Sequence, residues 1–443
     1  MLERIILSPY YLTLKIRHAL YDKGVFKVHT CDVPTICVGN IAAGGTGKTP
    51  HTEMILRELL ASEEWHDKNI AVLSRGHKRR SSGFQQVLVN DSASFAGDEP
   101  LQIKRKFPQV TVAVDRTRVE GCDFLLHPEK LQTSSNARKC ENKDIQKQDL
   151  IVLDDAFQYR SLEALFNIVL VDYNRPPAKD NLLPFGRLRD LPERLYHANV
   201  IIVTKCPSYL ENWDKIEMAK MLGISNYDVN TCKGIAAGGK SMTVLFTAIK
   251  YCPLEPVFED DDKRYVYSHN LILVSGIASD LALKRYLSDS YSIVKRFKFN
   301  DHHKYRRMDI RRIVKATRKW PTALIATTEK DSQRLRDYRK MPETLRHRMF
   351  QAPIEVEFLS EKEKEVFRTE LLGALRSFRS ARSFPVAPDW QASSQLRWRG
   401  CRRRSAPVRS GASQFALWAS ADSRLGKRRT FRDSHRRTST ILT

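Results

Sequence analysis

The segment from Thr35 to Leu60, TICVGNIAAGGTGKTPHTEMILRELL, constrains the fold more than any other part of the chain. Its first residues are β-branched and apolar and predict a buried strand; a glycine-rich turn and a stretch with leucine and isoleucine at helical spacing follow. Pro50 suits the first turn of a helix, where no backbone N–H is needed. A strand, a glycine turn and a helix N-terminus together favour a phosphate site, because the loop N–H groups and the helix dipole point at the same anion.

In such a P-loop, Lys48 would reach the β- and γ-phosphates of a nucleotide and the Thr49 hydroxyl would hold Mg²⁺. The strict pattern has glycine six residues before this lysine, where the chain has Ala42. The predicted nucleotide-binding residues are Gly44, Gly45, Thr46, Gly47, Lys48 and Thr49.

A perfect match to the strict pattern lies elsewhere, at Gly234–Ser241 (GIAAGGKS). The residues before it are polar, and the sequence MTVLFTAIKY after it predicts a strand instead of a helix. Since the phosphate site needs the helix N-terminus, we assign nucleotide binding to Lys48 and not to Lys240.

Two pairs of carboxylates follow the P-loop. Asp154 and Asp155 end a predicted strand at 149–153, which is the Walker B arrangement, in which an acid holds Mg²⁺ directly or through water. Asp98 and Glu99 lie in the first turn of a predicted helix. Acids there are typical of N-terminal capping, and equally of a metal or base pair that faces the nucleotide.

A loop at 181–190 carries Arg187, Arg189 and Asp190. Paired arginines near a phosphate site suggest an anion clamp, and arginines paired with local acids are the alternative. The polar stretch at 127–149 predicts a surface insertion.

The first 28 residues mix leucine, isoleucine and tyrosine with basic side chains. Pro9 should split this stretch and leave a helix of about four turns, which suits an interfacial helix whose basic residues face lipid headgroups. An ordinary amphipathic helix packed on its own domain is the alternative. There is no run of about 18 apolar residues, so no conventional spanning helix is expected.

The net charge of +24 lies largely at the C-terminal end, where residues 376–443 hold sixteen Lys or Arg against three acids. This tail is rich in Ser and Arg with little apolar periodicity and should be disordered. Two interpretations of this tail are open: an RNA- or lipid-binding arm, and the translation of a wrong reading frame. The eight cysteines form no CxxC pair and predict reduced thiols in the cytoplasm.

Strand and helix patterns alternate along most of the chain, which predicts an α/β protein with mostly parallel sheets. We expect a P-loop NTPase-type sheet and a second, smaller α/β lobe, joined by a two-stranded β linker. The predicted parts are an interfacial N-terminal helix (1–28), a P-loop domain (29–240), the linker strands and smaller lobe (243–359), a closing helix (360–375) and the disordered tail (376–443).

Eight short motifs occur in a fixed order: VGNIAAGGTGKTP, LSRG, GDEP, LDDAFQ, LLPFGRLRD, VTK, NDHH and TTEKD. With them, residues 1–375 resemble the tetraacyldisaccharide 4′-kinase family, which phosphorylates the lipid A precursor of Gram-negative envelopes. In that family the P-loop commonly lacks the first glycine, which explains Ala42. The chain departs from the family at Tyr159, where His is usual, at His77, where Tyr is usual, and at Asp190, where Glu is usual.

The resemblance implies that MgATP donates its γ-phosphate to the 4′-hydroxyl of a tetraacylated glucosamine disaccharide 1-phosphate. It implies that Asp98 is the catalytic base and that His302 supports it, which requires a closed cleft between the lobes. It also implies metal ligation by Thr49, Glu99, Asp154 and Asp155, and substrate binding by Asn40, Arg116 and Arg189.

A lipid substrate favours the interfacial interpretation of the N-terminal helix. The acyl chains of the substrate would stay in the bilayer while its sugar must reach a cytosolic ATP site. The resemblance therefore places the protein at the cytoplasmic face of the inner membrane of a Gram-negative bacterium, as a peripheral or monotopic protein. No nucleic-acid partner is expected, and the sequence leaves the oligomeric state open.

Two other classes of protein share part of this pattern. A partition- or septum-site-type switch ATPase has the signature KGGxGKT, and its first lysine position is Ala43 here. A nucleic-acid-binding ATPase would explain the positive charge, but that charge lies mostly in the tail, and no pattern of interleaved aromatic and basic residues is visible.

Overall fold

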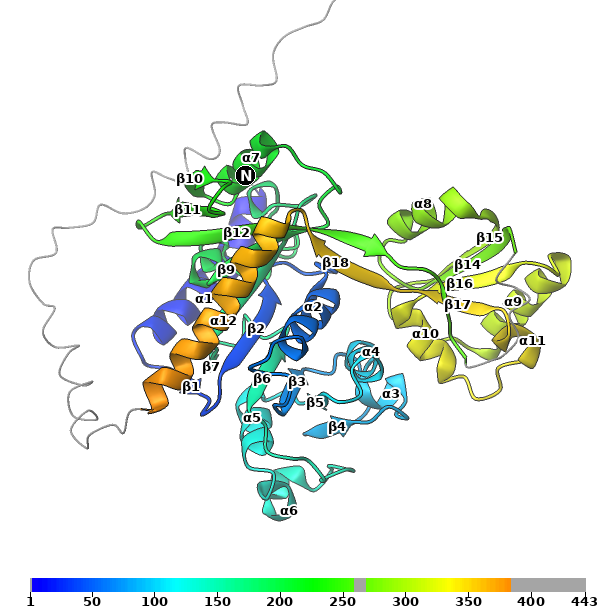
Figure 1. Ribbon diagram of the computed structural model, residues 1–443, viewed down its shortest axis with the longest axis horizontal. Coiled ribbons are helices and arrows are strands. Elements are labelled where there is room, and N and C mark those ends of the chain that lie inside the picture. The colour runs from blue at the N-terminus through cyan, green and yellow to red at the C-terminus, as the bar shows by residue number, and fades with distance from the viewer. Residues whose placement is uncertain (1, 259–267, 384–443) are drawn as a thin grey trace, which may run out of the picture. The chain divides into compact units, whose positions relative to one another are not determined.

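The computed structural model describes residues 2–258 and 268–383 (Figure 1), and Met1–Ala381 form one compact unit. Two separate sheets organise this unit, with an 11-stranded sheet in one part and a 5-stranded sheet in the other. Both sheets carry helices on their faces, so the predicted α/β class with a second, smaller lobe is confirmed.

The large sheet has the order β10-β11-β12-β9-β8-β2-β6-β3-β5-β4, and β18 also pairs with β12. The neighbouring strands from β12 to β5 in this order run parallel to one another. Parallel strands are usually buried on both faces, which is why these strands have continuous apolar sequences. The strands are β2 (Thr35–Asn40), β3 (Ile70–Ser74), β4 (Gln85–Val87), β5 (Thr111–Val114), β6 (Leu150–Asp154), β8 (Phe166–Asp172), β9 (Val200–Thr204), β10 (Ile224–Asp228), β11 (Lys233–Ala236), β12 (Ser241–Tyr251) and β18 (Ile354–Phe358).

Two apolar clusters cover the two faces of this sheet, because alternate side chains of each strand point to opposite sides. In β2, Ile36 and Val38 join one cluster and Cys37 joins the other. The first cluster includes side chains of α2, α4 and α12, and the second includes side chains of α5 and α7. These helices are α2 (Lys48–Leu60), α4 (Asp98–Lys106), α5 (Arg118–Leu126), α7 (Asn212–Met221) and α12 (Glu361–Ser383).

The smaller sheet has the order β13-β17-β16-β14-β15. Its strands are β13 (Glu255–Pro256), β14 (Asn270–Ser275), β15 (Ser292–Lys298), β16 (Leu324–Thr328) and β17 (Met349–Ala352). Its helices are α8 (Leu281–Ser290), α9 (Arg307–Lys319), α10 (Glu329–Arg336) and α11 (Glu343–Arg346). The antiparallel pair of β12 and β18 connects the two sheets (Figure 1), as the two-stranded linker was predicted to do.

The remaining elements are short, apart from the N-terminal helix. They are α1 (Leu2–Asp22), β1 (His29–Thr30), α3 (Ala93–Ala96), α6 (Lys130–Thr133), β7 (Leu162–Glu163) and the 3₁₀ turns η1 (Ser135–Ala137), η2 (Pro177–Lys179) and η3 (Pro192–His197). No helix in the described part of the chain is both long and apolar enough to span a bilayer.

The prediction that Pro9 splits the N-terminal stretch is wrong, because α1 is continuous from Leu2 to Asp22 with Pro9 inside it. A proline removes one backbone hydrogen bond from a helix. The following turns are held by contacts to the rest of the protein, including a hydrogen bond from the Tyr10 hydroxyl to the Arg189 carbonyl.

Two other boundaries also differ from the predictions. The 127–149 stretch is not only a surface insertion, since Leu131, Ala137 and Cys140 are buried in the core. The closing helix α12 continues past 375 to Ser383, and the Arg376 guanidinium pairs with Glu64 at 2.5 Å. The predicted disorder therefore does not begin at 376, and the rest of that predicted tail, 384–443, lies outside the described residues.

The perfect P-loop pattern at Gly234–Ser241 forms the β11–β12 hairpin, with Gly238 and Gly239 at positive φ in its turn. The Lys240 ammonium donates to the carbonyls of Tyr196 and Ala198 at 2.7 and 3.0 Å. A strand, β12, follows this pattern, as its sequence predicted, and no helix N-terminus stands there to bind a phosphate.

A buried ion cluster joins elements of the two sheets. The Lys106 ammonium of α4 contacts the carboxylates of Glu53 in α2 at 2.7 Å and Glu329 in α10 at 2.6 Å.

Replacing Lys106 by methionine leaves two buried carboxylates side by side and should lower the free energy of unfolding by about 3–5 kcal/mol. Denaturant titration measures the loss. Lys250→Met, which breaks the exposed pair with Glu357, is the matched control and should have little effect.

The same cluster gives an expected pH dependence. Burial and the charge of Glu53 outweigh Lys106 and raise the pKa of Glu329 from its usual 4.5 to about 7. A raised carboxyl pKa stabilises the fold at low pH, and this contribution is lost as the pH rises towards 7. Glu329→Gln should therefore flatten the fall in unfolding free energy between pH 4.5 and 7. If the unfolding free energy of Glu329→Gln fell as steeply with pH as that of the wild type, the pKa of Glu329 would not be the cause of the fall.

Candidate active site

The P-loop has the geometry that its sequence predicts. β2 ends at Asn40, the turn passes through Gly44 to Gly47, and α2 begins at Lys48. Gly47 has φ +86°, a left-handed conformation that favours glycine directly before the helix. The Asn40 amide donates to the Thr46 hydroxyl at 2.7 Å, and Thr204 of β9 donates to the Thr46 carbonyl at 3.0 Å. The loop is thus fixed from two sides.

The 181–190 loop runs along the P-loop. The Ala43 amide donates to the Arg187 carbonyl at 2.6 Å, and the Arg189 amide donates to the Ile41 carbonyl at 2.8 Å. The Arg189 guanidinium donates to Asn40 Oδ1 at 3.0 Å and lies 3.5 Å from Asp155. Of the three predicted substrate residues, the structure thus brings Asn40 and Arg189 together. Arg116 is exposed, in the turn between β5 and α5.

Asp190, the departure from the family pattern, is fully buried and accepts a hydrogen bond from His18 Nε2 of α1 at 2.6 Å. Its carboxylate therefore faces the N-terminal helix. This contact gives Asp190 a structural role.

The two Walker B acids end β6 next to Lys48. The Lys48 ammonium lies 3.5 Å from Asp155 Oδ1. The Ser74 hydroxyl donates to Asp154 Oδ2 at 3.1 Å, whereas Asp154 Oδ1 is buried without a hydrogen-bond partner among the described residues. An unpartnered carboxylate oxygen at this position suits a metal ion or its bound water.

The surroundings shift the pKa values of two carboxyl groups, Asp154 and Glu99, in opposite directions. Burial, Glu99 and Asp155 raise the pKa of Asp154 to about 7. Burial also raises the pKa of Glu99, but Lys330, Lys48 and His302 more than offset it and lower that pKa to about 2. A divalent cation would favour the ionised form of Asp154, because it adds positive charge where acids now repel one another.

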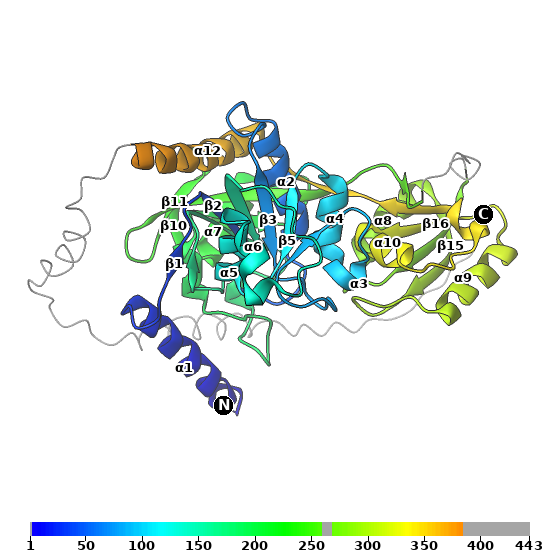
Figure 2. The same cartoon turned by 90° about the horizontal axis from the view of Figure 1, so that it is seen from below.

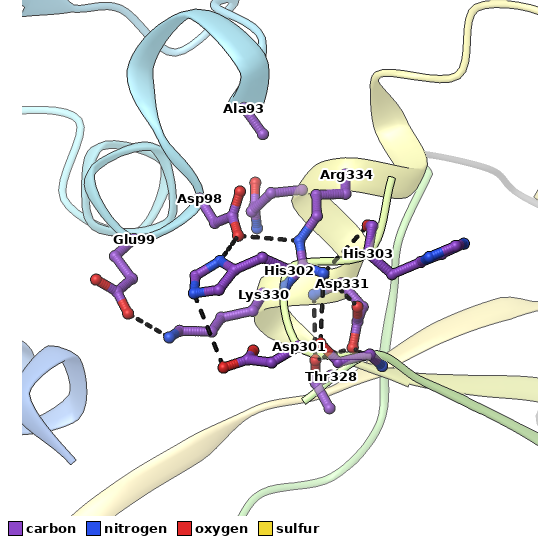
Figure 3. Close-up of polar contacts among 12 residues, drawn as sticks. Ala93, Asp98, Glu99, Asp301, His302, His303, Thr328, Lys330, Asp331 and Arg334 are labelled. Atoms are coloured by element: carbon purple, nitrogen blue, oxygen red, sulfur yellow. Dashed lines mark hydrogen bonds and ion pairs between the residues drawn. The ribbon is translucent and has the colours of Figure 1, made fainter. Parts of the chain in front are cut away.

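Asp98 and His302 are in contact, although they are far apart in the sequence (Figure 3). Asp98 begins α4, which packs on the large sheet, and His302 lies in the turn after β15 of the smaller sheet. His302 Nδ1 donates to Asp98 Oδ2 at 2.9 Å, and His302 Nε2 lies 3.9 Å from Asp301. Gly97, directly before Asp98, has φ +98° and ψ 151°, a conformation almost restricted to glycine. This turn sets Asp98 at the N-terminus of α4, facing the second sheet.

Two residues that sequence reasoning left without a role complete this contact. The Arg334 guanidinium of α10 lies 2.9 Å from Asp98 and 3.1 Å from Asp331, and the Lys330 ammonium donates to Glu99 (Figure 3). Each acid of the GDEP motif is thus paired with a cation from α10. The TTEKD motif gave a signal for Lys330, but no motif covered Arg334.

Arg118 is a third residue that the sequence did not reveal. Its guanidinium is buried and donates to the backbone carbonyls of Asp154 and Asp155, both at 3.3 Å. It therefore fixes the end of β6. His77, the other departure in this region, has its ring 5.5 Å from that of His302.

The predicted metal ligands do not form a complete cage. Among residues 2–258 and 268–383, no group of three or more His, Cys, Asp or Glu side chains is arranged to hold a metal ion. Mg²⁺ in phosphoryl-transfer sites takes most of its ligands from phosphates and water and only one or two from carboxylates. The assignment of Thr49, Glu99, Asp154 and Asp155 stays a prediction that the unpartnered oxygen of Asp154 fits.

Comparisons with known proteins give a consistent result. Residues 4–376 match the family described as Tetraacyldisaccharide-1-P 4′-kinase. The chain is 36% identical over 367 residues to the tetraacyldisaccharide 4′-kinase of Phocaeicola vulgatus, covering 82% of this chain and 91% of that protein. It is 38% identical over 363 residues to the enzyme of the same name from Parabacteroides distasonis, covering 80% and 89%.

One solved structure has a similar fold. The crystal structure of LpxK from Aquifex aeolicus in complex with ATP matches with a TM-score of 0.57 and 24% sequence identity. The match covers 85% of this chain and all of that chain. It supports the arrangement of the two sheets described above.

Proposed function

Because this chain belongs to the tetraacyldisaccharide-1-P 4′-kinase family, we propose that it transfers the γ-phosphate of ATP to the 4′-hydroxyl of a tetraacylated glucosamine disaccharide 1-phosphate, a step of lipid A biosynthesis. The observation that carries this proposal is the hydrogen bond between Asp98 and His302, next to Glu99, whose pKa, despite burial, is lowered by the charges of Lys330, Lys48 and His302. A switch ATPase that only hydrolyses nucleotide has no need of such a base for a sugar hydroxyl.

The P-loop would hold the phosphates of ATP. Backbone N–H groups from Gly44 to Gly47 and the N-terminus of α2 attract the anion, and Lys48 neutralises charge on the β- and γ-phosphates. Thr49, Glu99, Asp154 and Asp155 would hold Mg²⁺, which when bound neutralises phosphate charge and helps to align the donor. Most of the rate enhancement comes from this positioning and charge neutralisation.

Asp98 would accept the proton of the 4′-hydroxyl. A sugar hydroxyl is a weak acid, so the base assists mainly late in the transfer, and such assistance is typically worth ~10²–10⁴-fold. His302 and Arg334 hold the Asp98 carboxylate by hydrogen bond and ion pair. They would orient the oxygen that receives the proton.

We also propose that the protein works as a peripheral or monotopic protein at the cytoplasmic face of the inner membrane of a Gram-negative bacterium. α1 supports this proposal, because Leu14 and His18 face the protein while Leu12, Lys15 and Ile16 are exposed. An exposed face with apolar and basic side chains suits the boundary between headgroups and acyl chains. The acyl chains of the substrate would then stay in the bilayer.

The full chain, γ-labelled ATP and the lipid disaccharide 1-phosphate in detergent micelles test the proposal. Labelled lipid that carries a second phosphate at the 4′-position is the expected product. Release of phosphate without transfer to lipid, or ATP turnover that DNA or RNA stimulates and the lipid does not, would overturn it.

A further inference from the structure

The helix α9 presents an exposed face that is almost entirely cationic. It has seven exposed positions, and six of them are Arg or Lys. These are Arg307, Arg311, Arg312, Lys315, Arg318 and Lys319, and the seventh is Met308, which is 64% exposed.

The spacing of these side chains places them on one side of the helix. Residues three and four positions apart are neighbours on a helix surface, so Arg307, Arg311, Lys315 and Arg318 form one row and Met308, Arg312 and Lys319 lie next to it. The opposite side carries Ile310 and Ile313, which pack into the core of the smaller sheet. The cationic face therefore turns away from the protein, and both views show α9 on the outside of that sheet (Figures 1 and 2).

The charges of this face are not neutralised inside the described part of the chain. None of the six cations forms an ion pair with a described residue. The one acid within α9, Asp309, is mostly buried and receives a hydrogen bond from His303 at 2.9 Å.

The edge strand β15 extends the same surface. Lys295 is exposed on β15, on the same face of the strand as Phe297. The Arg312 guanidinium and the Lys295 ammonium both lie 5.8 Å from the centre of the Phe297 ring. Lys295 of the strand and Arg312 of the helix thus both lie next to Phe297.

We propose that the cationic face of α9 is a docking surface for an anionic lipid bilayer, separate from α1. Clusters of four to eight Lys and Arg on an amphipathic helix bind anionic lipid surfaces through the surface potential. Met308 gives the N-terminal end of the face one exposed apolar side chain that can enter the headgroup layer. A single-stranded nucleic acid is the less suitable partner, because Phe297 is buried and the partly exposed Trp320 ring lies under the Lys319 ammonium, so that neither ring is open for bases to stack on.

This surface does not depend on the phosphoryl-transfer site, since none of its residues contacts the P-loop or the Asp98–His302 pair. It would give the smaller sheet its own attachment to the membrane. The affinity should fall with ionic strength, because salt screens exposed charges.

Vesicle co-sedimentation of the full chain tests the proposal, with phosphatidylglycerol–phosphatidylcholine vesicles and pure phosphatidylcholine vesicles. The triple variant Arg307→Glu, Arg311→Glu, Lys315→Glu should lower partitioning onto the anionic vesicles by at least ~10-fold and leave the weak binding to phosphatidylcholine unchanged. The conservative variant Arg307→Lys, Arg311→Lys should bind as the wild type does.

The matched control makes the same change in charge at scattered exposed lysines, with Lys68→Glu, Lys220→Glu and Lys362→Glu. It should lose far less binding than the triple variant. An equal loss in both variants would show that only net charge matters and would overturn the proposal. So would a triple variant that binds vesicles normally but loses affinity for an RNA or DNA oligonucleotide. Equal thermal midpoints of all variants exclude misfolding.

Discussion

Replacing Lys48 by alanine should lower the rate of phosphoryl transfer by on the order of 10²–10³-fold or more, because the variant loses the cation that neutralises the transferred phosphate. The Lys48 ammonium lies within the site, 3.5 Å from Asp155, and its side chain is 15% exposed. The fold should survive, since the P-loop is also held by Asn40 and Thr204. Steady-state transfer of label from ATP to the lipid disaccharide measures the loss.

The chain supplies a matched control for this variant. Lys240 occupies the lysine of the perfect P-loop pattern, but it lies in the β11–β12 hairpin and binds two backbone carbonyls. Lys240→Ala should keep kcat within about twofold, since surface changes away from a site alter little. If Lys240→Ala abolished transfer and Lys48→Ala did not, the nucleotide site would be misplaced.

Replacing Asp98 by asparagine should lower kcat by ~10²–10⁴-fold with little change in the KM for ATP, because the amide cannot accept the hydroxyl proton. His302→Ala should lower kcat in the same direction, since it removes the hydrogen bond that orients Asp98. Initial rates at varied ATP and varied lipid separate the effect on kcat from the effect on KM.

The neighbouring histidine is the control for this pair. His303 bonds to Asp309 at 2.9 Å and stacks on Phe299 with ring centres 4.4 Å apart, so its side chain serves the smaller lobe. His303→Ala should affect thermal stability more than kcat. Wild-type turnover in Asp98→Asn would remove the assignment of the base, whatever happens in the other variants.

The P-loop and Walker B acids could be predicted because each depends on a short stretch of chain. The glycines before Lys48 and the strand that ends in Asp154 carry their geometry locally, so pattern and spacing identify them. The same reasoning rejected the better pattern at Lys240, because a strand follows it instead of a helix. The predicted linker strands also appear as the paired β12 and β18.

The contact between Arg334 and Asp98 could not be predicted, because it depends on how two sheets face each other. Arg334 reaches Asp98 only through the packing of α10 against α4, and a helical arginine gives no pattern of its own. The errors at Pro9 and at the end of α12 have a similar origin. Tertiary contacts hold helical segments there that local propensity would end.

The contacts between α1 and the 181–190 loop have a consequence for orientation. Tyr10 binds the Arg189 carbonyl and His18 binds Asp190, so two successive residues of the loop beside the phosphate turn are fastened to one helix. A bilayer that holds α1 would thereby set both the height and the tilt of the nucleotide pocket above the lipid. The sugar of each lipid substrate would then reach the γ-phosphate of ATP at the same depth. The enzyme would not have to reorient on the membrane for each substrate.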